Sequence, residues 1–243
     1  MTRATVVLLH GVGLDHTVWR PVQALLPDTI ETVAPDLAGH GANPPAQEDI
    51  SLADLADGVV GAIPPGSHLV GFSLGALVAQ HIAVHRPELV ASLTSVSSVC
   101  KRTAEERAAV LSRLDVAAKD FAASAEASLQ RWYDGTEVSA EQVRLTRTTL
   151  LANDPDSFLN CYRVFATADA DIADDLFRIS VPALAITGER DPGSTPEMTR
   201  RLAESIPHCQ AVIVPGARHM LPVERPRDLV DHLSAFIGEN AHV

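Results

Sequence analysis

Three residues of this sequence could together perform nucleophilic catalysis on a carbonyl group. Ser73 is the centre of a Gly-x-Ser-x-Gly motif, and Asp191 and His219 each come shortly after a later apolar segment. A serine hydroxyl is a weak nucleophile unless a base takes its proton, and the base needs a third group that orients it. We therefore predict attack by Ser73, with His219 as the base and Asp191 as the group that holds the imidazole.

The segment around Ser73 is typical of a tight junction between a strand and a helix. The apolar run 68–72 predicts a strand, and the run 76–85 predicts a helix. Gly71 and Gly75 have no Cβ, so the strand and the helix can pack closely on either side of the turn. Ser73 is then expected at the helix N-terminus, where backbone N–H groups favour negative charge. The motif alone is weak evidence for catalysis, so the other two residues matter.

Strand-like and helix-like segments alternate along the chain, which predicts a mostly parallel sheet with helices on both faces. Ligands bind such sheets beyond the carboxyl ends of the strands, where Ser73, Asp191 and His219 are all expected. His10 and Asp36 also follow strand-like segments and could replace the histidine and the aspartate, although we favour loop-structuring roles for both. Conversely, Asp191 could only shape a turn, and His219 could be an ordinary loop histidine.

The composition predicts a soluble α/β protein. The 243 residues are 46% hydrophobic and carry a net charge of −12, which disfavours nucleic acid or an anionic membrane as a partner. No apolar run approaches the ~20 residues that span a bilayer, and no signal-peptide pattern opens the chain. Cys100, Cys161 and Cys209 lack metal-ligand spacing and are expected to be reduced thiols. We therefore expect a cytoplasmic protein that binds a small molecule and needs no metal or cofactor. The oligomeric state is not predicted.

Strand signals vanish between residues 103 and 177, where Ala, Arg and Glu dominate at helical spacing. We interpret residues 101–179 as a cap of roughly four or five helices, inserted into a core of residues 1–100 and 180–243. An arginine in the cap could bind a substrate carboxylate, although a solvent-exposed helix face is the alternative for each arginine. The candidate substrate contacts are Arg131, Trp132, Tyr133, Arg144, Arg147, Tyr162 and Arg163 in the cap, together with Met220 beside the predicted base.

Motifs along nearly the whole chain resemble those of the α/β-hydrolase superfamily, and the order serine, aspartate, histidine is the order of that superfamily. The motifs are His10-Gly11, Asp36-Leu37-Ala38-Gly39-His40-Gly41, Gly71-Phe72-Ser73-Leu74-Gly75, Gly188-Glu189-Arg190-Asp191 and Gly216-Ala217-Arg218-His219. The resemblance implies the α/β-hydrolase fold, with a sheet of about six main strands and an inserted helical cap. The backbone N–H groups of Val12 and Leu74 are the expected donors of the oxyanion hole.

Within the superfamily, the chain is similar to 3-oxoadipate enol-lactonases and related small esterases. The similarity is carried by Arg131-Trp132-Tyr133, Asp154-Pro155 and Val223-Glu224-Arg225-Pro226, whereas the N-terminal β-hairpin of enol-lactonases is absent here. It implies a cofactor-free serine hydrolase that acts on a small carboxylic ester or lactone. One such substrate would be a carboxylate-bearing lactone like that of the enol-lactonases. The alternatives are a carbon–carbon bond hydrolase of the meta-cleavage type, a proton-abstracting lyase of the 2-succinyl-cyclohexadiene synthase type, and a non-catalytic small-molecule receptor.

Overall fold

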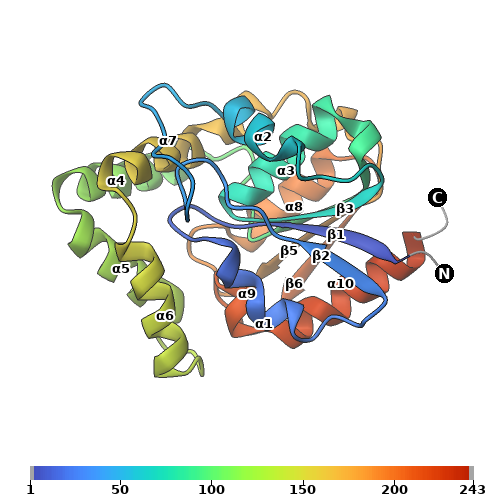
Figure 1. Ribbon diagram of the computed structural model, residues 1–243. Coiled ribbons are helices and arrows are strands. Elements are labelled where there is room, and N and C mark those ends of the chain that lie inside the picture. Colours follow the sequence, from blue (N-terminus) through green and yellow to red (C-terminus); the bar gives the residue numbers. More distant parts are fainter. Residues whose placement is uncertain (1–2, 241–243) are drawn as a thin grey trace.

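The computed structural model describes residues 3–240, whose strands form one parallel six-stranded sheet in the order β2-β1-β3-β4-β5-β6 (Figure 1). The predicted parallel sheet is thereby confirmed, while the predicted core limits at residues 1 and 243 lie outside the described residues. Four of the six strands are almost entirely buried, because helices cover both faces of the sheet. The strands are β1 (Ala4–Leu9), β2 (Ile30–Val33), β3 (Ser67–Phe72), β4 (Val90–Val96), β5 (Ala183–Gly188) and β6 (Cys209–Val214).

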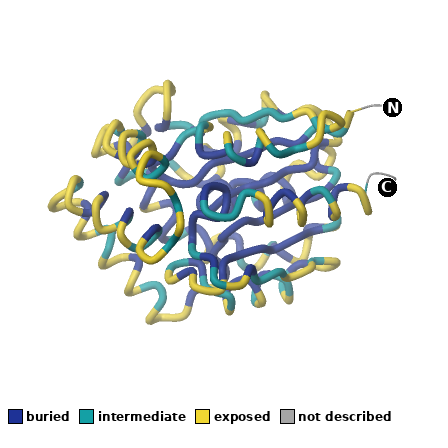
Figure 2. Tube along the Cα trace, turned by 90° about the horizontal axis from the view of Figure 1, so that it is seen from below, coloured by how far each residue is buried: buried dark blue, intermediate teal, exposed yellow. Residues whose placement is uncertain are grey.

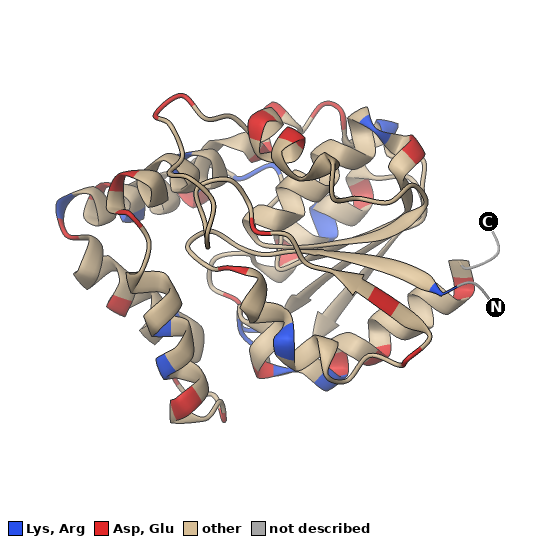
Figure 3. Cartoon of the chain, viewed as in Figure 1, with Lys and Arg blue, Asp and Glu red and all other residues tan. Residues whose placement is uncertain are grey.

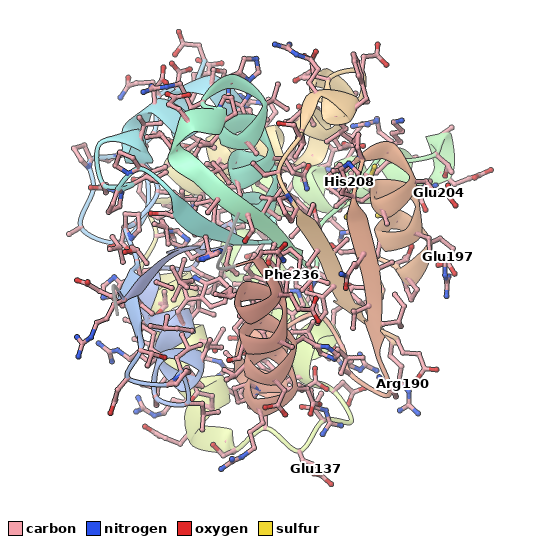
Figure 4. All side chains as sticks on the ribbon, turned by 90° about the vertical axis from the view of Figure 1, so that its right-hand side faces the viewer. Glu137, Arg190, Glu197, Glu204, His208 and Phe236 are labelled. Carbon is pink, nitrogen blue, oxygen red and sulfur yellow. The ribbon has the colours of Figure 1, made fainter. Side chains whose placement is uncertain are left out.

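Helices pack on both faces of the sheet (Figure 1). One face carries α1 (Arg20–Gln23), α9 (Leu221–Glu224) and α10 (Pro226–Asn240), and the other carries α2 (Leu52–Val60), α3 (Leu74–His85) and α8 (Pro196–Ser205). Phe236, labelled in Figure 4, is one of the buried side chains of α10. His208, labelled in the same view, directly precedes β6 and so belongs to the amino end of that strand.

Four helices between β4 and β5 form the inserted cap beside the carboxyl ends of the strands (Figure 1). They are α4 (Ala104–Lys119), α5 (Phe121–Tyr133), α6 (Ala140–Leu151) and α7 (Pro155–Asp171), all within the predicted cap of residues 101–179. A side-chain oxygen accepts a backbone N–H at the start of each helix, which explains where each one begins. These N-cap residues are Thr103, Asp120, Ser139 and Asp154.

Buried charges hold the two ends of the cap together. The fully buried Asp169 of α7 pairs with Arg102, which precedes α4, at 2.7 Å, and with Arg107 of α4 at 2.9 Å. Arg201 of α8 pairs with Glu106 of α4 at 2.7 Å, which ties the cap to the core. Removing one partner of such a buried network would leave an uncompensated charge, so the network fixes where the cap sits.

The strands run through the buried centre of the molecule, while the outer turns of the cap helices are exposed (Figure 2). Charged residues lie mainly on helices and loops, and the strands carry very few of them (Figure 3). Among the described helices, none is long and apolar enough to cross a membrane.

Candidate active site

Ser73 occupies the one-residue turn between β3 and α3, with a φ of 55° and a ψ of −113°. A non-glycine residue with positive φ is strained and persists only where the surrounding structure enforces it. The neighbouring glycines supply that enforcement. A Cβ on Gly75 would overlap the carbonyl oxygen of Leu9 in β1, and a Cβ on Gly71 would overlap the carbonyl oxygen of Gly75. The motif therefore forms the tight strand–turn–helix junction expected of a nucleophile elbow.

Asp191 and His219 form a short hydrogen bond beyond the carboxyl ends of β5 and β6. The distance between His219 Nδ1 and Asp191 Oδ2 is 2.6 Å, and both residues are buried. The other carboxylate oxygen, Oδ1, accepts the backbone N–H groups of Gly193 at 2.8 Å and Ser194 at 2.9 Å. Because an ionised carboxylate only accepts hydrogen bonds, the proton of this pair belongs on Nδ1. That tautomer leaves Nε2 of His219 free to accept a proton.

The backbone of His219 is held by a residue that the sequence analysis did not single out as a site residue. Ser97 directly follows β4, and its Oγ donates a hydrogen bond of 2.9 Å to the carbonyl of His219. Ser97 adopts a φ of 46°, which turns it away from the strand direction. The available signal was the position of this serine at a strand end, but the partner lies 122 residues away in the sequence.

Val12 and Leu74 remain the predicted donors of an oxyanion hole. Val12 lines the same pocket as Ser73, and Leu74 is the first residue of α3, so its N–H has no acceptor within the helix. The loop that carries Val12 is held by His10, whose Nε2 accepts the Leu37 N–H at 2.9 Å while Nδ1 donates to the Gly11 carbonyl at 2.9 Å. Burial lowers the pKa of His10, which keeps this bridging imidazole neutral.

His10 and Asp36 therefore have loop-structuring roles, as the sequence analysis favoured. Neither residue lines the pocket that contains Ser73. Asp36 Oδ1 accepts hydrogen bonds from the backbone N–H of His16 at 2.7 Å and from its Nδ1 at 2.9 Å.

A cavity of about 60 Å³ lies between the core and the cap, and Ser73, Asp191 and His219 all line it. Every cap helix contributes to the opposite wall, which is mainly aromatic and aliphatic apart from two arginines. Its cap residues are Arg113, Ser128, Arg131, Trp132, Leu150, Phe158, Tyr162 and Phe165. Of the predicted substrate contacts, Arg131, Trp132 and Tyr162 therefore lie at the pocket.

The other predicted substrate contacts lie elsewhere. Tyr133 is buried, and its hydroxyl hydrogen-bonds to Thr146 of α6 at 2.9 Å, so it stabilises the cap rather than lining the pocket. Met220 directly follows His219, but it is fully buried and belongs to the hydrophobic core. Three further cap arginines do not line the pocket, and their guanidinium groups bind other residues of the protein. Arg144 pairs with Glu141, Arg147 pairs with Glu126, and Arg163 donates to the carbonyl of Glu48.

The guanidinium groups of Arg131 and Arg113 form no ion pair with an acidic residue in the described chain, unlike Arg144 and Arg147. Arg131 donates from Nη2 to Ser128 Oγ at 2.7 Å. Burial and then the nearby charge of Arg113 lower the pKa of Arg131. Sequence reasoning missed Arg113, because a single arginine within a helix carries no local signal of which way it points.

The sequence profile described as "Alpha/beta hydrolase family" matches residues 6–232 of this chain. The chain belongs to the alpha/beta hydrolase family. The predicted resemblance is thereby confirmed, and with it the fold. Among residues 3–240, no group of three or more His, Cys, Asp and Glu side chains is arranged to hold a metal ion.

Two curated hydrolases align with almost the whole chain. One is the (E)-2-((N-methylformamido)methylene)succinate hydrolase of Acinetobacter baylyi, 31% identical, covering 95% of this chain and 89% of the relative. The other is a pimeloyl-[acyl-carrier protein] methyl ester esterase of Aeromonas salmonicida, 30% identical, covering 96% and 94%. Among solved structures, the enol-lactonase from Burkholderia xenovorans superposes with a TM-score of 0.84 at 22% identity, covering 98% of this chain and 92% of that one. The structural likeness supports the fold, and the relatives make this chain a member of a hydrolase family.

Proposed function

We propose that this chain hydrolyses a small carboxylic ester or lactone that carries a carboxylate, through an acyl intermediate on Ser73. The observation that carries the proposal is the guanidinium of Arg131, which faces the cavity of Ser73, Asp191 and His219 without a carboxylate partner in the described chain. A cavity of about 60 Å³ has room for about five water molecules at ~10–15 Å³ each, which suits a small substrate.

In the acylation step, Ser73 Oγ attacks the carbonyl carbon while His219 Nε2 takes the hydroxyl proton. Asp191 stabilises the imidazolium that forms, and the N–H groups of Val12 and Leu74 donate to the tetrahedral oxyanion. A donor of this kind contributes about 3 kcal/mol to transition-state stabilisation. The imidazolium then protonates the leaving oxygen, and the carbon–oxygen bond of the ester breaks.

In the second step, water attacks the acyl carbon, and His219 takes its proton and returns it to Ser73. With a lactone, the leaving oxygen stays attached to the acyl chain, so ring opening yields a single hydroxy-acid product. With an open-chain ester, the alcohol leaves before water attacks. Both substrate classes use the same groups of the protein, so the geometry of the cavity decides between them.

Carboxylate binding follows from the charge of the cavity wall. Arg131 and Arg113 place two positive charges against a largely apolar surface, where a charge-assisted hydrogen bond is stronger than in water. A bound carboxylate would supply the anion that both arginines lack. The planar guanidinium of Arg131 can also hold a carboxylate by two parallel hydrogen bonds, which orients the substrate carbonyl toward Ser73.

A second candidate reaction is hydrolysis of a carbon–nitrogen bond in an unsaturated dicarboxylate. It is favoured by the 31% identity to the Acinetobacter hydrolase, whose name describes a succinate derivative with an N-methylformamido group. The two arginines of the wall suit a substrate with two carboxylates as well as a substrate with one. Incubation with such an N-acyl enamine, followed by mass spectrometry of the products, distinguishes the two reactions.

The proposal is tested with matched substrates that differ in one carboxylate. The wild-type protein should hydrolyse monomethyl glutarate with a higher kcat/KM than methyl valerate, in which a methyl group replaces the carboxylate. Arg131→Gln should lower kcat/KM for the charged ester by about 10- to 100-fold, the usual effect of a lost hydrogen bond to a charged group, and leave the neutral ester within threefold of wild type. Arg144→Gln is the matched control, because this exposed cap arginine pairs with Glu141 instead.

An equal loss on both esters would contradict carboxylate recognition by Arg131. The proposal would also be wrong if Ser73→Ala hydrolysed either ester at the wild-type rate. Turnover of neither ester, together with turnover of the N-acyl enamine, would favour the second candidate.

A further inference from the structure

Arg218 connects the catalytic loop, which is the loop of residues 215–220 that carries His219, to the cap. It lies between β6 and α9, directly before His219, and its backbone N–H donates to Glu224 Oε2 at 2.8 Å. Its side chain extends to the cap, where Nη1 donates to the carbonyl oxygen of Arg131 at 2.8 Å. The residue is therefore held by the core at its backbone and by the cap at its guanidinium.

The acceptor of this hydrogen bond lies in the last turn of α5. The final carbonyls of an α-helix have no partner within the helix and need hydrogen-bond donors from elsewhere. Gln130 and Tyr133 satisfy theirs with backbone N–H groups just beyond the helix, whereas the carbonyl of Arg131 receives the guanidinium of Arg218. A cation at this position also interacts favourably with the negative end of the helix dipole. Arg218 thus acts as a C-terminal cap of α5, supplied from the catalytic loop.

The residues that follow Arg131 and Arg218, which are Trp132 and His219, are also in contact. The ring of Trp132 stacks on the imidazole of His219, with ring centroids 5.9 Å apart and planes inclined by 24°. Phe72 from β3 also contacts the imidazole, at 5.1 Å between centroids. The pair Arg131-Trp132 therefore meets the pair Arg218-His219 through two adjacent contacts, one polar and one aromatic. The cap supplies part of the packing that holds the catalytic imidazole.

We propose that Arg218 is a positioning residue, which seats the last turn of α5 on the catalytic loop and thereby orients His219 through Trp132. The inference rests on the proposed function, because it assigns His219 as the base for Ser73. Arg131 carries both the carbonyl that Arg218 binds and the guanidinium that faces the cavity. The seating of α5 on the loop therefore positions the guanidinium of Arg131, which binds the substrate, together with His219, which takes the proton. A cap displaced from the loop would move both groups out of the positions that catalysis requires, and a displacement of about 1 Å is enough to lower the rate.

The test compares Arg218→Met, which keeps an unbranched, flexible side chain but removes the guanidinium donors and their charge, with Arg218→Lys, which restores a cationic donor. On a neutral p-nitrophenyl ester, Arg218→Met should lower kcat by about tenfold while KM changes by less than threefold. Arg218→Lys should recover most of the loss. Arg200→Met is the control, because Arg200 is exposed on α8 and pairs with Glu197 within that helix. Urea unfolding of every variant establishes that the fold is retained.

A double-mutant cycle with Trp132→Leu tests whether the Arg218–Arg131 hydrogen bond and the Trp132–His219 stacking contact depend on each other. Arg218→Met and Trp132→Leu together should lower kcat little more than the more harmful single change, because either one releases the turn. Fully additive losses, or an Arg218→Met kcat within twofold of wild type, would overturn the inference.

The neutral ester keeps this result separate from the proposed substrate class, because it carries no carboxylate. If Arg131→Gln discriminates no substrates but the Arg218 variants behave as described, the carboxylate proposal fails and the positioning role stands. If Ser73→Ala retains full activity on the neutral ester, the proposed mechanism and the inference fail together.

Discussion

Substituting His40 by asparagine should make the fold less sensitive to mild acid. His40 is 2% exposed, and its Nδ1 hydrogen-bonds to the carbonyl of Ala38 at 3.0 Å. Its ring lies 5.1 Å from that of His10, which is also buried. Burial lowers the pKa of His40 to about 3, and the neighbouring His10 acts in the same direction, whereas Asp36 and the bond to Ala38 oppose the shift.

The sign and size of the effect follow from proton binding. An unfolded chain protonates this histidine near its ordinary pKa of 6.5, while the folded protein does so only near 3. Between these values the unfolded state binds one more proton, so the free energy of unfolding falls as the pH falls, by about 1.4 kcal/mol per pH unit for each such group. For His40 the loss between pH 7 and pH 5 is about 2 kcal/mol. The lowered pKa of His10 adds a loss of the same sign.

The assay is urea unfolding at pH 7, 6 and 5. The drop in unfolding free energy from pH 7 to pH 5 should be smaller in His40→Asn than in wild type by about 2 kcal/mol, whatever the absolute stability of the variant. Asparagine keeps a side-chain N–H that can donate to the Ala38 carbonyl. His232→Asn is the control, because His232 is exposed on α10 and its substitution should leave the drop unchanged. An equal drop in His40→Asn and wild type would refute the reasoning.

Two further substitutions test the geometry of the site. Gly75→Ala should lower the free energy of unfolding, measured with urea, by at least about 3 kcal/mol, because the added Cβ overlaps the Leu9 carbonyl oxygen. Gly61→Ala is the control and should not destabilise the fold, because a Cβ at this position meets nothing within 4 Å. A Gly75→Ala protein of wild-type stability would contradict the close packing. Asp191→Asn should retain the fold but lower kcat by about 10³- to 10⁴-fold in steady-state kinetics, because an amide placed there favours the wrong imidazole tautomer. A loss of less than tenfold would argue against the assigned role of Asp191.

The sequence was sufficient to predict that Ser73, Asp191 and His219 lie in one pocket, because a parallel sheet places the carboxyl ends of its strands along one edge. Each residue follows a different strand, so topology alone predicts that they converge. The glycines of the elbow were equally informative. The motif itself shows that the turn has no Cβ at two positions, and this absence permits the close packing of the strand and the helix.

The cap was less predictable, because the direction of a helical side chain depends on how the helix packs. Arg144 and Arg131 are both cap arginines in helices, yet Arg144 pairs with Glu141 at the surface and Arg131 faces the cavity. Arg113 also lines the cavity, but nothing in its neighbourhood in the sequence distinguishes it from an exposed arginine. Ser97 and Arg218 act through partners far away in the chain, and such contacts have no local signature.

The central claim is that Ser73 is an activated nucleophile, and covalent labelling tests it most directly. Wild type, Ser73→Ala and His219→Ala are incubated with a fluorophosphonate, and the intact mass of each is measured over time. The account predicts one adduct on wild type, none on Ser73→Ala, and much slower labelling of His219→Ala because no base takes the serine proton. Absence of the adduct on wild type, while a known serine hydrolase is labelled in parallel, or equal labelling of Ser73→Ala, would contradict the account.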